Sequence, residues 1–212
     1  MFLEKKIIFP LFISSFPIVI IFSVFWFLSL DVQWYKKEFK KFHIYEEVDK
    51  NTADQSISNI VLYLQGKEPL DKNVFSPQAR YHLFDVKIIF QAIRVVVIIF
   101  TLFGAALLAY MAYALKWQDV IKVFSESLII TCIFLFIVGI FIVFFHTSFE
   151  AMHKLFFVND LWLFDPSDPL IQLFPEKLFF DLGMRIYVFS CLLSIFLLLP
   201  SVYIKKNFKI NN

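Results

Sequence analysis

Four long runs of apolar residues constrain the fold of this chain more than any other feature. The first, "IIFPLFISSFPIVIIFSVFWFLSL", extends from Ile7 to Leu30 without a charged side chain. A helix rises about 1.5 Å per residue, so this run can cross a hydrocarbon core of about 30 Å. It is long for the core of a signal peptide, and no small-x-small cleavage site follows it. We therefore interpret it as a membrane span.

Three further runs have the same character and cover Val95–Leu115, Leu128–Phe145 and about Leu182–Ile204. The chain of 212 residues is 59% hydrophobic and contains 30 phenylalanines. Its mean hydropathy is +0.72. A soluble domain of this length cannot bury so much apolar surface, which makes lipid the expected solvent. The sequence thus predicts an all-α membrane protein with four transmembrane helices.

Four spans place both ends of the chain on one side of the membrane. The basic stretches "KWQDVIK" after Leu115 and "KKNFK" in the tail favour the cytoplasm for that side. Lys36, Lys37, Lys40 and Lys41, just after the first span, argue the other way. We favour a cytoplasmic location for both ends, which leaves two large loops outside as a small extracellular cap.

The predicted organisation alternates spans with loops along the chain. Its segments are transmembrane helix 1 (7–30), the first portion of the extracellular cap (31–85), transmembrane helix 2 (86–115), a cytoplasmic linker (116–126), transmembrane helix 3 (127–146), the second portion of the extracellular cap (147–181), transmembrane helix 4 (182–204) and a cytoplasmic tail (205–212).

The first large loop carries the marks of ordered helices. Thr52 and Gln55 have the spacing of a capping box, and Gly66 suits the residue just past the helix that would follow. Apolar residues between them recur at helical spacing, namely Ile57, Ile60, Val61 and Leu64. Ser76 and Pro77 then resemble an N-cap and a first-turn proline. A second helix is expected to start there and continue into the second span.

Several functional classes lack support. The net charge of +2, without a basic face, does not favour a nucleic-acid partner. Cys132 and Cys191 lie inside apolar runs and are expected to be inert packing residues. The P-loop, the Rossmann fingerprint and the G-x-S-x-G motif are missing. Histidine is then the best available acid–base group, because its unperturbed pKa of about 6.5 leaves it mostly neutral at pH 7.

All four histidines lie at or beyond the predicted exterior boundary: His43, His82, His146 and His153. In "YHLFDVK", His82 and Asp85 share a helix face, whereas His146, Glu150 and His153 follow i, i+4, i+7 spacing. Interfacial histidines are most often hydrogen-bonding anchors. His146, Glu150 and His153 could alternatively be ligands in the zinc site of a membrane hydrolase, although they lack the HExxH order and a third strong ligand.

Charged and aromatic residues near the boundaries have structural and functional interpretations. Lys87 and Arg94, seven residues apart, share one helix face, and Arg185 lies at the start of the fourth span. Such side chains either snorkel to the headgroups or anchor a lipid carbonyl or phosphate. Trp162 fits an interfacial aromatic belt. The pairs Asp165-Pro166 and Asp168-Pro169 fit turns, and Pro175-Glu176 fits a helix start.

Two stretches together resemble a known family. "FFVNDLWLFDPSDPLIQLFPEKLF", Phe156–Phe179, and "HLFDVK", His82–Lys87, are similar to the bacterial lipoprotein intramolecular transacylases. The resemblance covers most of the chain, including the span order and the loop lengths. It implies a four-span membrane protein of Gram-positive bacteria with an extracellular cap. It also implies a multi-pass protein of the bacterial cell membrane whose active site faces outward.

The resemblance implies a reaction and a substrate. The partner is a diacylated lipoprotein with a free N-terminal cysteine amine, and the enzyme moves the sn-2 acyl chain to that amine, which gives a lyso-form lipoprotein. His82 and His153 are the implied catalytic pair, with Asp85 as a candidate to orient His82. The expected substrate-binding residues are Asp85, Lys87, Arg94, Phe157, Asn159, Asp160, Trp162, Asp165 and Arg185. No metal, nucleotide or acyl-carrier cofactor is expected. The alternative is a non-enzymatic membrane protein whose cap binds lipoprotein or lipid.

Overall fold

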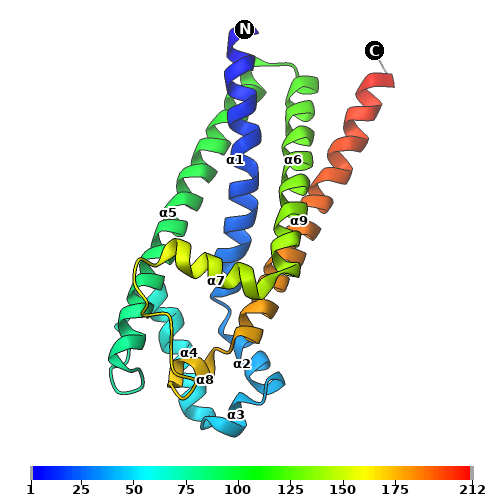
Figure 1. Ribbon diagram of the computed structural model, residues 1–212. Helices are drawn as coiled ribbons and strands as arrows, with labels where there is room; N and C mark the ends of the chain where they lie inside the picture. Colours follow the sequence, from blue (N-terminus) through cyan, green and yellow to red (C-terminus); the bar gives the residue numbers. More distant parts are fainter. Residues whose placement is uncertain (1, 211–212) are drawn as a thin grey trace. The chain divides into compact units, whose positions relative to one another are not determined.

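The computed structural model describes residues 2–210, without the side chains of residues 2–4, 205 and 207–210, and these residues form helices and connections without a strand. The four long helices are α1 (Phe2–Ser29), α5 (Pro77–Ala114), α6 (Trp117–Val143) and α9 (Glu176–Ile210) (Figure 1). The five short ones are α2 (Val32–Lys41), α3 (Ile44–Glu47), α4 (Lys50–Leu64), α7 (Phe145–Phe156) and α8 (Pro169–Leu173).

Each long helix is long and apolar enough to span a membrane, over Lys5–Ser29, Pro77–Ala114, Trp117–Val143 and Glu176–Ile204. The prediction of an all-α protein with four membrane helices is therefore confirmed. The last residues of the predicted tail, 211–212, lie outside the described residues.

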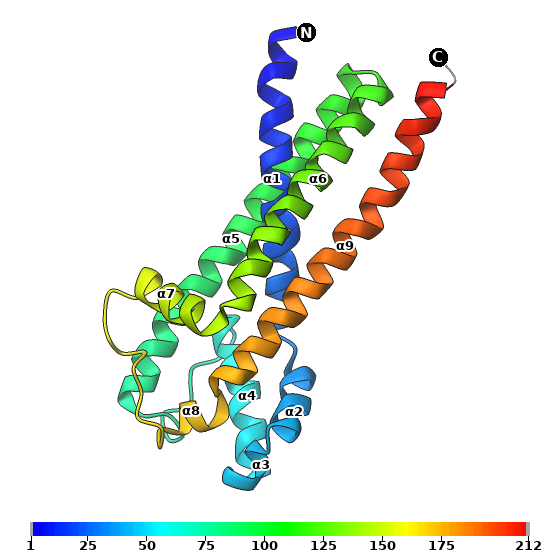
Figure 2. The same ribbon diagram turned by 45° about the vertical axis from the view of Figure 1, so that its right-hand side comes forward.

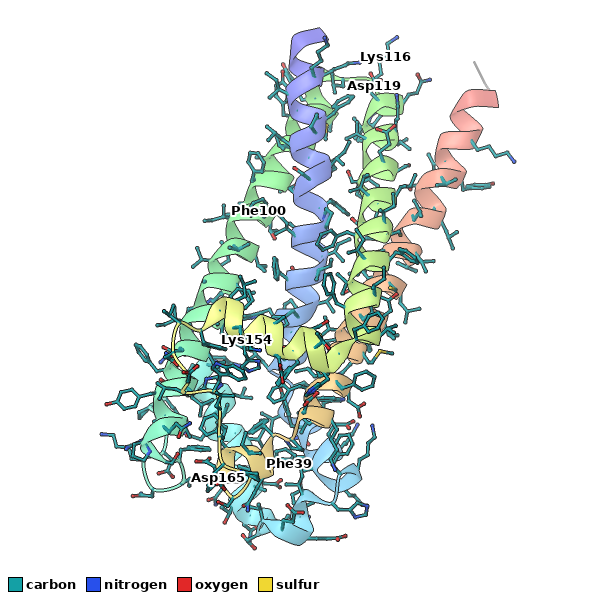
Figure 3. All side chains as sticks on the ribbon, in the orientation of Figure 1. Phe39, Phe100, Lys116, Asp119, Lys154 and Asp165 are labelled. Carbon is teal, nitrogen blue, oxygen red and sulfur yellow. The ribbon has the colours of Figure 1, made fainter. Side chains whose placement is uncertain are left out.

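The chain divides into two compact units. Unit 1 comprises Met1–Phe25, Val95–Phe141 and Arg185–Asn212, and unit 2 comprises Trp26–Arg94 and Ile142–Met184. Within unit 1, the beginning of α1, the α5–α6 connection and the end of α9 lie at the same end (Figures 1 and 2). Lys5 of α1 donates to Asp119 of α6 at that end, over 2.6 Å, near the labelled Lys116 (Figure 3).

Unit 1 has the surface and the interior of a lipid-embedded bundle. Large apolar side chains remain exposed on its helices, for example Leu102 at 67% and Phe136 at 70%. The buried hydroxyls of Ser125, Ser127 and Thr131 each donate to the carbonyl one turn earlier, over 2.8 Å. Such bonds satisfy the hydroxyl group within its own helix, as a surrounding without water requires.

Unit 2 contains both of the long connections predicted from the sequence. Its short helices α2, α3, α4 and α8 gather around a common apolar core (Figures 1 and 2). Phe39 of α2 is fully buried there, with ring centroids of Tyr45 and Phe174 each 6.0 Å away. Leu173 of α8 and Leu178 of α9 are buried as well.

The two ends of α4 show why this helix starts and stops where it does. The predicted cap at Thr52 is wrong, because Asp49 is the N-cap and its carboxylate accepts the backbone N–H of Thr52 over 3.0 Å. Gly66 is confirmed as the residue past the helix, with φ +76. The N–H of Gly66 donates to the carbonyl of Tyr63, and the N–H of Lys67 donates to the carbonyl of Leu62. This is the hydrogen-bond pattern of a Schellman motif.

Two helix starts from distant segments of the chain meet in unit 2. Ser76 caps α5 by accepting the N–H of Ala79 over 3.1 Å, and its hydroxyl donates to Asp168 over 2.8 Å. The other oxygen of Asp168 caps α8 by accepting the N–H of Leu170 over 2.8 Å. Asp168-Pro169 is therefore a helix start, not the turn expected from the sequence. Lys41 and Asp181 form a further link between the two connections.

The third span ends before the residues that carry the histidine row. α6 stops at Val143, and α7 starts at Phe145 after Phe144, whose φ of −100 and ψ of 43 are not helical. In Figure 1, α7 runs crosswise to the portion of α5 that belongs to unit 2. This break redirects the chain, so that α7 carries His153 toward the first turns of α5.

Candidate active site

A pair of buried imidazoles forms the centre of unit 2. His82 lies in the second turn of α5, and His153 lies near the end of α7. Their ring centroids are 6.1 Å apart with an interplanar angle of 22°, and each residue is only 8% exposed. The two histidines that the resemblance selected are thus brought together from segments far apart in the chain.

Aromatic side chains enclose both rings. Phe157 packs against both, with centroid distances of 4.9 Å to His82 and 5.5 Å to His153. The remaining contacts are Phe164 with His82 at 5.5 Å, Trp162 with His153 at 5.0 Å, and Phe149 with His153 at 4.3 Å. Such an enclosure excludes water and strengthens every polar interaction that forms within it.

A hydrogen bond fixes the tautomer of His153. Its Nδ1 lies 2.8 Å from the carbonyl oxygen of Phe149, one turn earlier in α7. A carbonyl oxygen only accepts, so Nδ1 carries the proton and Nε2 of the neutral ring carries the lone pair. Burial lowers the pKa of His153 below its ordinary 6.5, although the bond to Phe149 acts in the opposite direction. At pH 7 the ring is therefore a neutral base with a free Nε2.

His82 is held differently. Its Nδ1 is buried and has no hydrogen-bond partner among the described residues. The Asp85 carboxylate, which the sequence suggested as its orienting partner, instead accepts a hydrogen bond from the side-chain amide of Asn159 over 3.0 Å. Packing against Phe157 and Phe164 is what positions His82 here.

The segment after α7, which we call the strap (residues 158–164), is fastened to α5. The Nε2 of Gln78 donates to the carbonyl oxygens of Leu161 and Leu163, over 3.2 and 2.9 Å. The side-chain oxygen of Asn159 accepts the N–H of Leu161 over 3.1 Å. These bonds flank Trp162 and so hold its indole against His153.

Three members of this centre were missed by the sequence analysis: Gln78, Phe149 and Phe164. The position of Phe149, four residues before His153, offered a signal, because residues at i and i+4 meet on a helix. No pattern in the sequence marks Gln78 as a donor to a segment more than eighty residues away.

Other predicted site residues have contacts elsewhere. The ammonium of Lys87 lies 4.2 Å from the ring centroid of Tyr63. The Asp165 carboxylate accepts the backbone N–H of Ser167 within its own turn, over 2.8 Å. Arg94 is exposed, and Arg185 belongs to unit 1, where its guanidinium lies 6.0 Å from the ring of Phe189. Lys87 and Asp165 thus have contacts of their own, distinct from the rings that pack on the imidazole pair.

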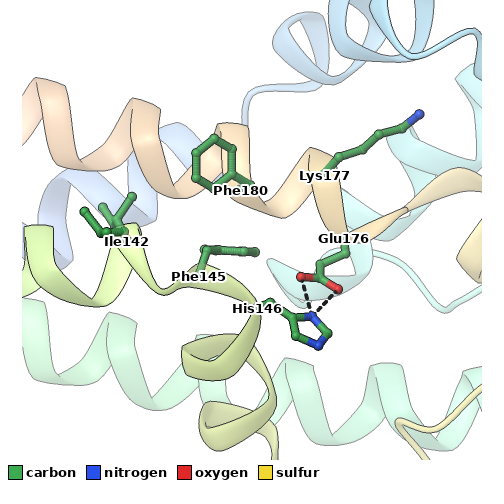
Figure 4. Close-up of a pocket in the computed structure, with 7 residues that line it drawn as sticks. Ile142, Phe145, His146, Glu176, Lys177 and Phe180 are labelled. Atoms are coloured by element: carbon green, nitrogen blue, oxygen red, sulfur yellow. Dashed lines mark hydrogen bonds and ion pairs between the residues drawn. The ribbon is translucent and has the colours of Figure 1, made fainter.

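His146 serves a different contact. Its Nδ1 lies 2.9 and 3.0 Å from the two oxygens of Glu176, at the mouth of an open cavity of about 430 Å³ walled by Ile142, Phe145 and Phe180 (Figure 4). The Glu176 carboxylate raises the pKa of His146. Among the described residues, no three His, Cys, Asp or Glu side chains converge as metal ligands. The row His146-Glu150-His153 therefore does not form the predicted alternative zinc site.

Comparisons with known proteins identify the family. The model of the family described as lipoprotein intramolecular transacylase Lit matches residues 9–180. The chain belongs to this family. It is thus an acyltransferase of a membrane-integral, lipoprotein-directed family, as the resemblance implied. A search of curated protein sequences gave no match.

Solved structures of the same family share the fold. The membrane-integral lipoprotein intramolecular transacylase Lit from Bacillus cereus is 23% identical, with a TM-score of 0.85 over 99% of this chain and 100% of the other. A variant of that protein with one histidine replaced by alanine gives a TM-score of 0.79 at 22% identity, over 98% and 96% of the two chains. A variant with arginine at the same place gives 0.74 at 23% identity, over 100% and 98%.

Proposed function

We propose that this transacylase moves the sn-2 acyl chain of a diacylglyceryl-cysteine lipoprotein to the α-amine of the same cysteine, by acid–base catalysis at His82 and His153. The observation that supports this most strongly is the enclosed imidazole pair. Two neutral imidazoles in a site shielded from water supply a proton acceptor and a proton donor. These are the groups that aminolysis of an ester needs.

His153 is the proposed general base. The amine attacks the ester carbonyl carbon only through its lone pair, so the ammonium first releases one proton to water. As the C–N bond forms, the nitrogen must lose a second proton. The Nε2 of His153 is free to take that proton, because Nδ1 is already engaged with the carbonyl of Phe149. When the bond between the acyl carbon and the glyceryl oxygen breaks, the same nitrogen returns the proton to the leaving oxygen. The total mass of the lipoprotein is unchanged.

His82 is the proposed donor to the oxyanion. A buried N–H without a partner is rarer and more costly than an unpaired acceptor. The unpartnered, buried Nδ1 of His82 therefore favours the tautomer with its proton on Nε2. In that form Nε2–H stabilises the oxygen of the tetrahedral intermediate. The mutual repulsion of two charges at a centroid distance of 6.1 Å also disfavours simultaneous protonation of the pair.

The aromatic walls have a role in proximity. Attack closes a medium ring through the acyl carbon, the ester oxygen, two glyceryl carbons, the sulfur, Cβ, Cα and the nitrogen, which is entropically unfavourable. A rigid site that folds the headgroup removes some of this cost before the reaction. Trp162 and Phe157 supply such walls, and the bonds of Asn159 and Gln78 hold the strap that carries Trp162.

The experiment is tandem mass spectrometry of a reporter lipopeptide from a host that leaves lipoproteins diacylated with a free amine. The wild-type protein should give an N-acyl, mono-acylglyceryl cysteine of unchanged mass, and His82→Asn and His153→Asn should abolish this product. An N-acylated product that keeps both glyceryl chains would point to an intermolecular transfer instead. Unaltered lipopeptide in every sample would refute the proposed reaction.

The alternative, a cap that binds lipoprotein or lipid without chemistry, predicts a different response. A binding protein tolerates replacement of a buried histidine by asparagine so long as the fold persists. A transacylase loses turnover and keeps its substrate affinity. Measuring affinity and turnover on the same purified variants therefore separates the two functions.

We also propose that unit 2 faces the outside of the bacterial cell, where diacylated lipoproteins are anchored, and that Arg94 and Arg185 contact lipid headgroups. Cysteines introduced at Asn73 in unit 2 and at Lys116 in the α5–α6 connection test the orientation. On intact cells a membrane-impermeant thiol reagent should label Asn73→Cys and spare Lys116→Cys. The opposite pattern would reverse the topology.

A further inference from the structure

A second cavity adjoins the imidazole pair and is not explained by the reaction alone. It measures about 400 Å³ and is lined by Glu150, Lys154, Phe157, Asp160, Trp162 and Leu163. Phe157 and Trp162 are the rings that pack on His153, with centroid distances of 5.5 and 5.0 Å. The cavity therefore shares a wall with the catalytic centre, and all of its residues belong to unit 2.

The cavity carries an excess of negative charge. Glu150 is partly compensated, because it lies 3.4 Å from the ammonium of Lys154 and 3.6 Å from the Nε2 of His146. The exposed side chain of Asp160 makes no hydrogen bond or ion pair among the described residues, and only its backbone carbonyl is used, by the N–H of Leu163 over 3.0 Å. Two carboxylates thus face one ammonium inside the same cavity, which suits a cationic group.

α7 separates this cavity from an apolar surface. At about 100° per residue, Phe145 and Phe149 fall on one side of His153, and Glu150 and Lys154 fall on the other. The rings of Phe145 and Phe149 lie 5.4 Å apart, and Phe179 packs on Phe149 at 5.4 Å. His153 therefore stands between an aromatic row that suits an acyl chain and a charged cavity that does not.

We propose that this cavity is the subsite for the α-ammonium of the substrate cysteine, with Asp160 as its counter-ion and Glu150 as the second carboxylate. The inference rests on the proposed function, because it assumes that a free N-terminal amine is the acceptor. The α-amine is the cationic group of that substrate nearest to the ester. Held in the cavity, its nitrogen lies next to Phe157 and Trp162, the rings that pack on His153. It reacts after one proton has left for water, and the imidazole then takes the second proton as the C–N bond forms.

A consequence is selectivity for substrates that have not yet been N-acylated. The product carries an uncharged amide in place of the ammonium, so the carboxylates no longer attract it. The acidic cavity would thereby admit the substrate and release the product at the same site.

The test compares two ligands on the purified full-length protein in lipid nanodiscs. One is an S-glyceryl cysteine peptide with a free amine and two ether-linked chains, and the other is its N-acetylated analogue, so neither can react. Turnover and KM are measured separately with the diacyl peptide. The wild type should bind the free amine about fivefold more tightly, the scale of a solvent-exposed charge pair. Asp160→Asn should lose most of this preference through a higher KM, with kcat nearly unchanged, and the double change with Glu150→Gln should lose all of it.

Two controls separate this role from a structural one. Glu68→Gln removes one exposed carboxylate of unit 2 that has no partner among the described residues, and it should leave the preference intact. The wild-type preference should also fade as pH rises through the α-amine pKa of about 8, whereas a packing defect would not follow that titration.

Each outcome decides a separate point. A preference retained by the double variant, with turnover by the wild type, overturns the ammonium subsite and leaves the proposed reaction standing. A preference that the carboxylate variants abolish, without any turnover by the wild type, supports the subsite and refutes the reaction. Equal binding of both peptides by the wild type refutes the subsite outright.

Discussion

Gln78 offers the sharpest test of how the strap contributes to activity. Its single side-chain amide donates to two carbonyls that flank Trp162, at 3.2 and 2.9 Å, and makes no hydrogen bond to either imidazole among the described residues. Gln78→Ala removes both bonds. A neutral hydrogen bond contributes about 1 kcal/mol net, so the closed strap loses about 2 kcal/mol relative to an open one. That shifts the closed-to-open ratio about thirtyfold.

We expect kcat/KM for the lipopeptide to fall by up to about thirtyfold, because Trp162 then spends less time against His153. The melting temperature should change little, since the strap lies at the surface and its opening is local. Hydrogen exchange at the backbone amides of residues 161–164 should accelerate in parallel. The assays are initial rates by mass spectrometry and exchange on the same preparation.

Gln91→Ala is a matched control. It removes the same kind of bond, from a glutamine amide to the Leu64 carbonyl over 2.6 Å, at another place in unit 2. It should lower stability by about 1 kcal/mol and leave kcat/KM within about twofold. Faster exchange in the strap of Gln78→Ala combined with unchanged kcat/KM would show that ordering of Trp162 is not required for the reaction.

Further predictions concern His153, Gly66 and Phe39. Because burial lowers the pKa of His153 below 6.5, kcat should hold as pH falls through 6.5 and decline only at lower pH; an acid limb at or above 6.5 in a pH–rate profile would contradict the assigned base. The same shift makes unfolding easier in acid, since the unfolded chain binds a proton at 6.5 that the folded chain resists. Gly66→Ala should destabilise unit 2 by about 1–2 kcal/mol, because φ is +76 while the nearest atom to a new Cβ, on Gln91, leaves room at 3.5 Å; a melting curve unchanged from the wild type would refute backbone strain there. Phe39→Ala, which empties the core position labelled in Figure 3, should cost about 3–5 kcal/mol, and an unaltered denaturation midpoint would mean that the short helices repack.

The spans could be predicted from sequence because lipid imposes a simple rule: a run without charge and of sufficient length becomes a helix that crosses. The start of α5 was equally readable, since Ser76 and Pro77 are local features, and so was Gly66 at the end of α4. The cap of α4 was misplaced because Asp49 and Thr52 both suit that role. Which of the two caps the helix depends on which side chain lies close to the free backbone N–H groups of the first turn.

The site was predictable only to a limited extent. His82 and His153 came from the resemblance, not from any spacing, because they approach each other through folding of separate loops. Asp85 was expected to orient His82, the histidine nearest to it in sequence. Its carboxylate instead accepts a hydrogen bond from Asn159 of the other loop. Contacts of this kind depend on how two segments dock, which no local pattern encodes. The break at Phe144 was not predicted for a similar reason, since its immediate neighbours include neither glycine nor proline.

The hydrogen bond from Ser76 to Asp168 joins residues 92 positions apart and links the starts of α5 and α8. During synthesis Ser76 and His82 leave the ribosome long before Asp168 and His153 exist. The nascent chain therefore carries an incomplete centre through the insertion of its second and third helices. In the proposed mechanism, chemistry begins only when translation delivers the second loop, so a truncated or stalled chain is expected to be inert toward the lipoproteins around it.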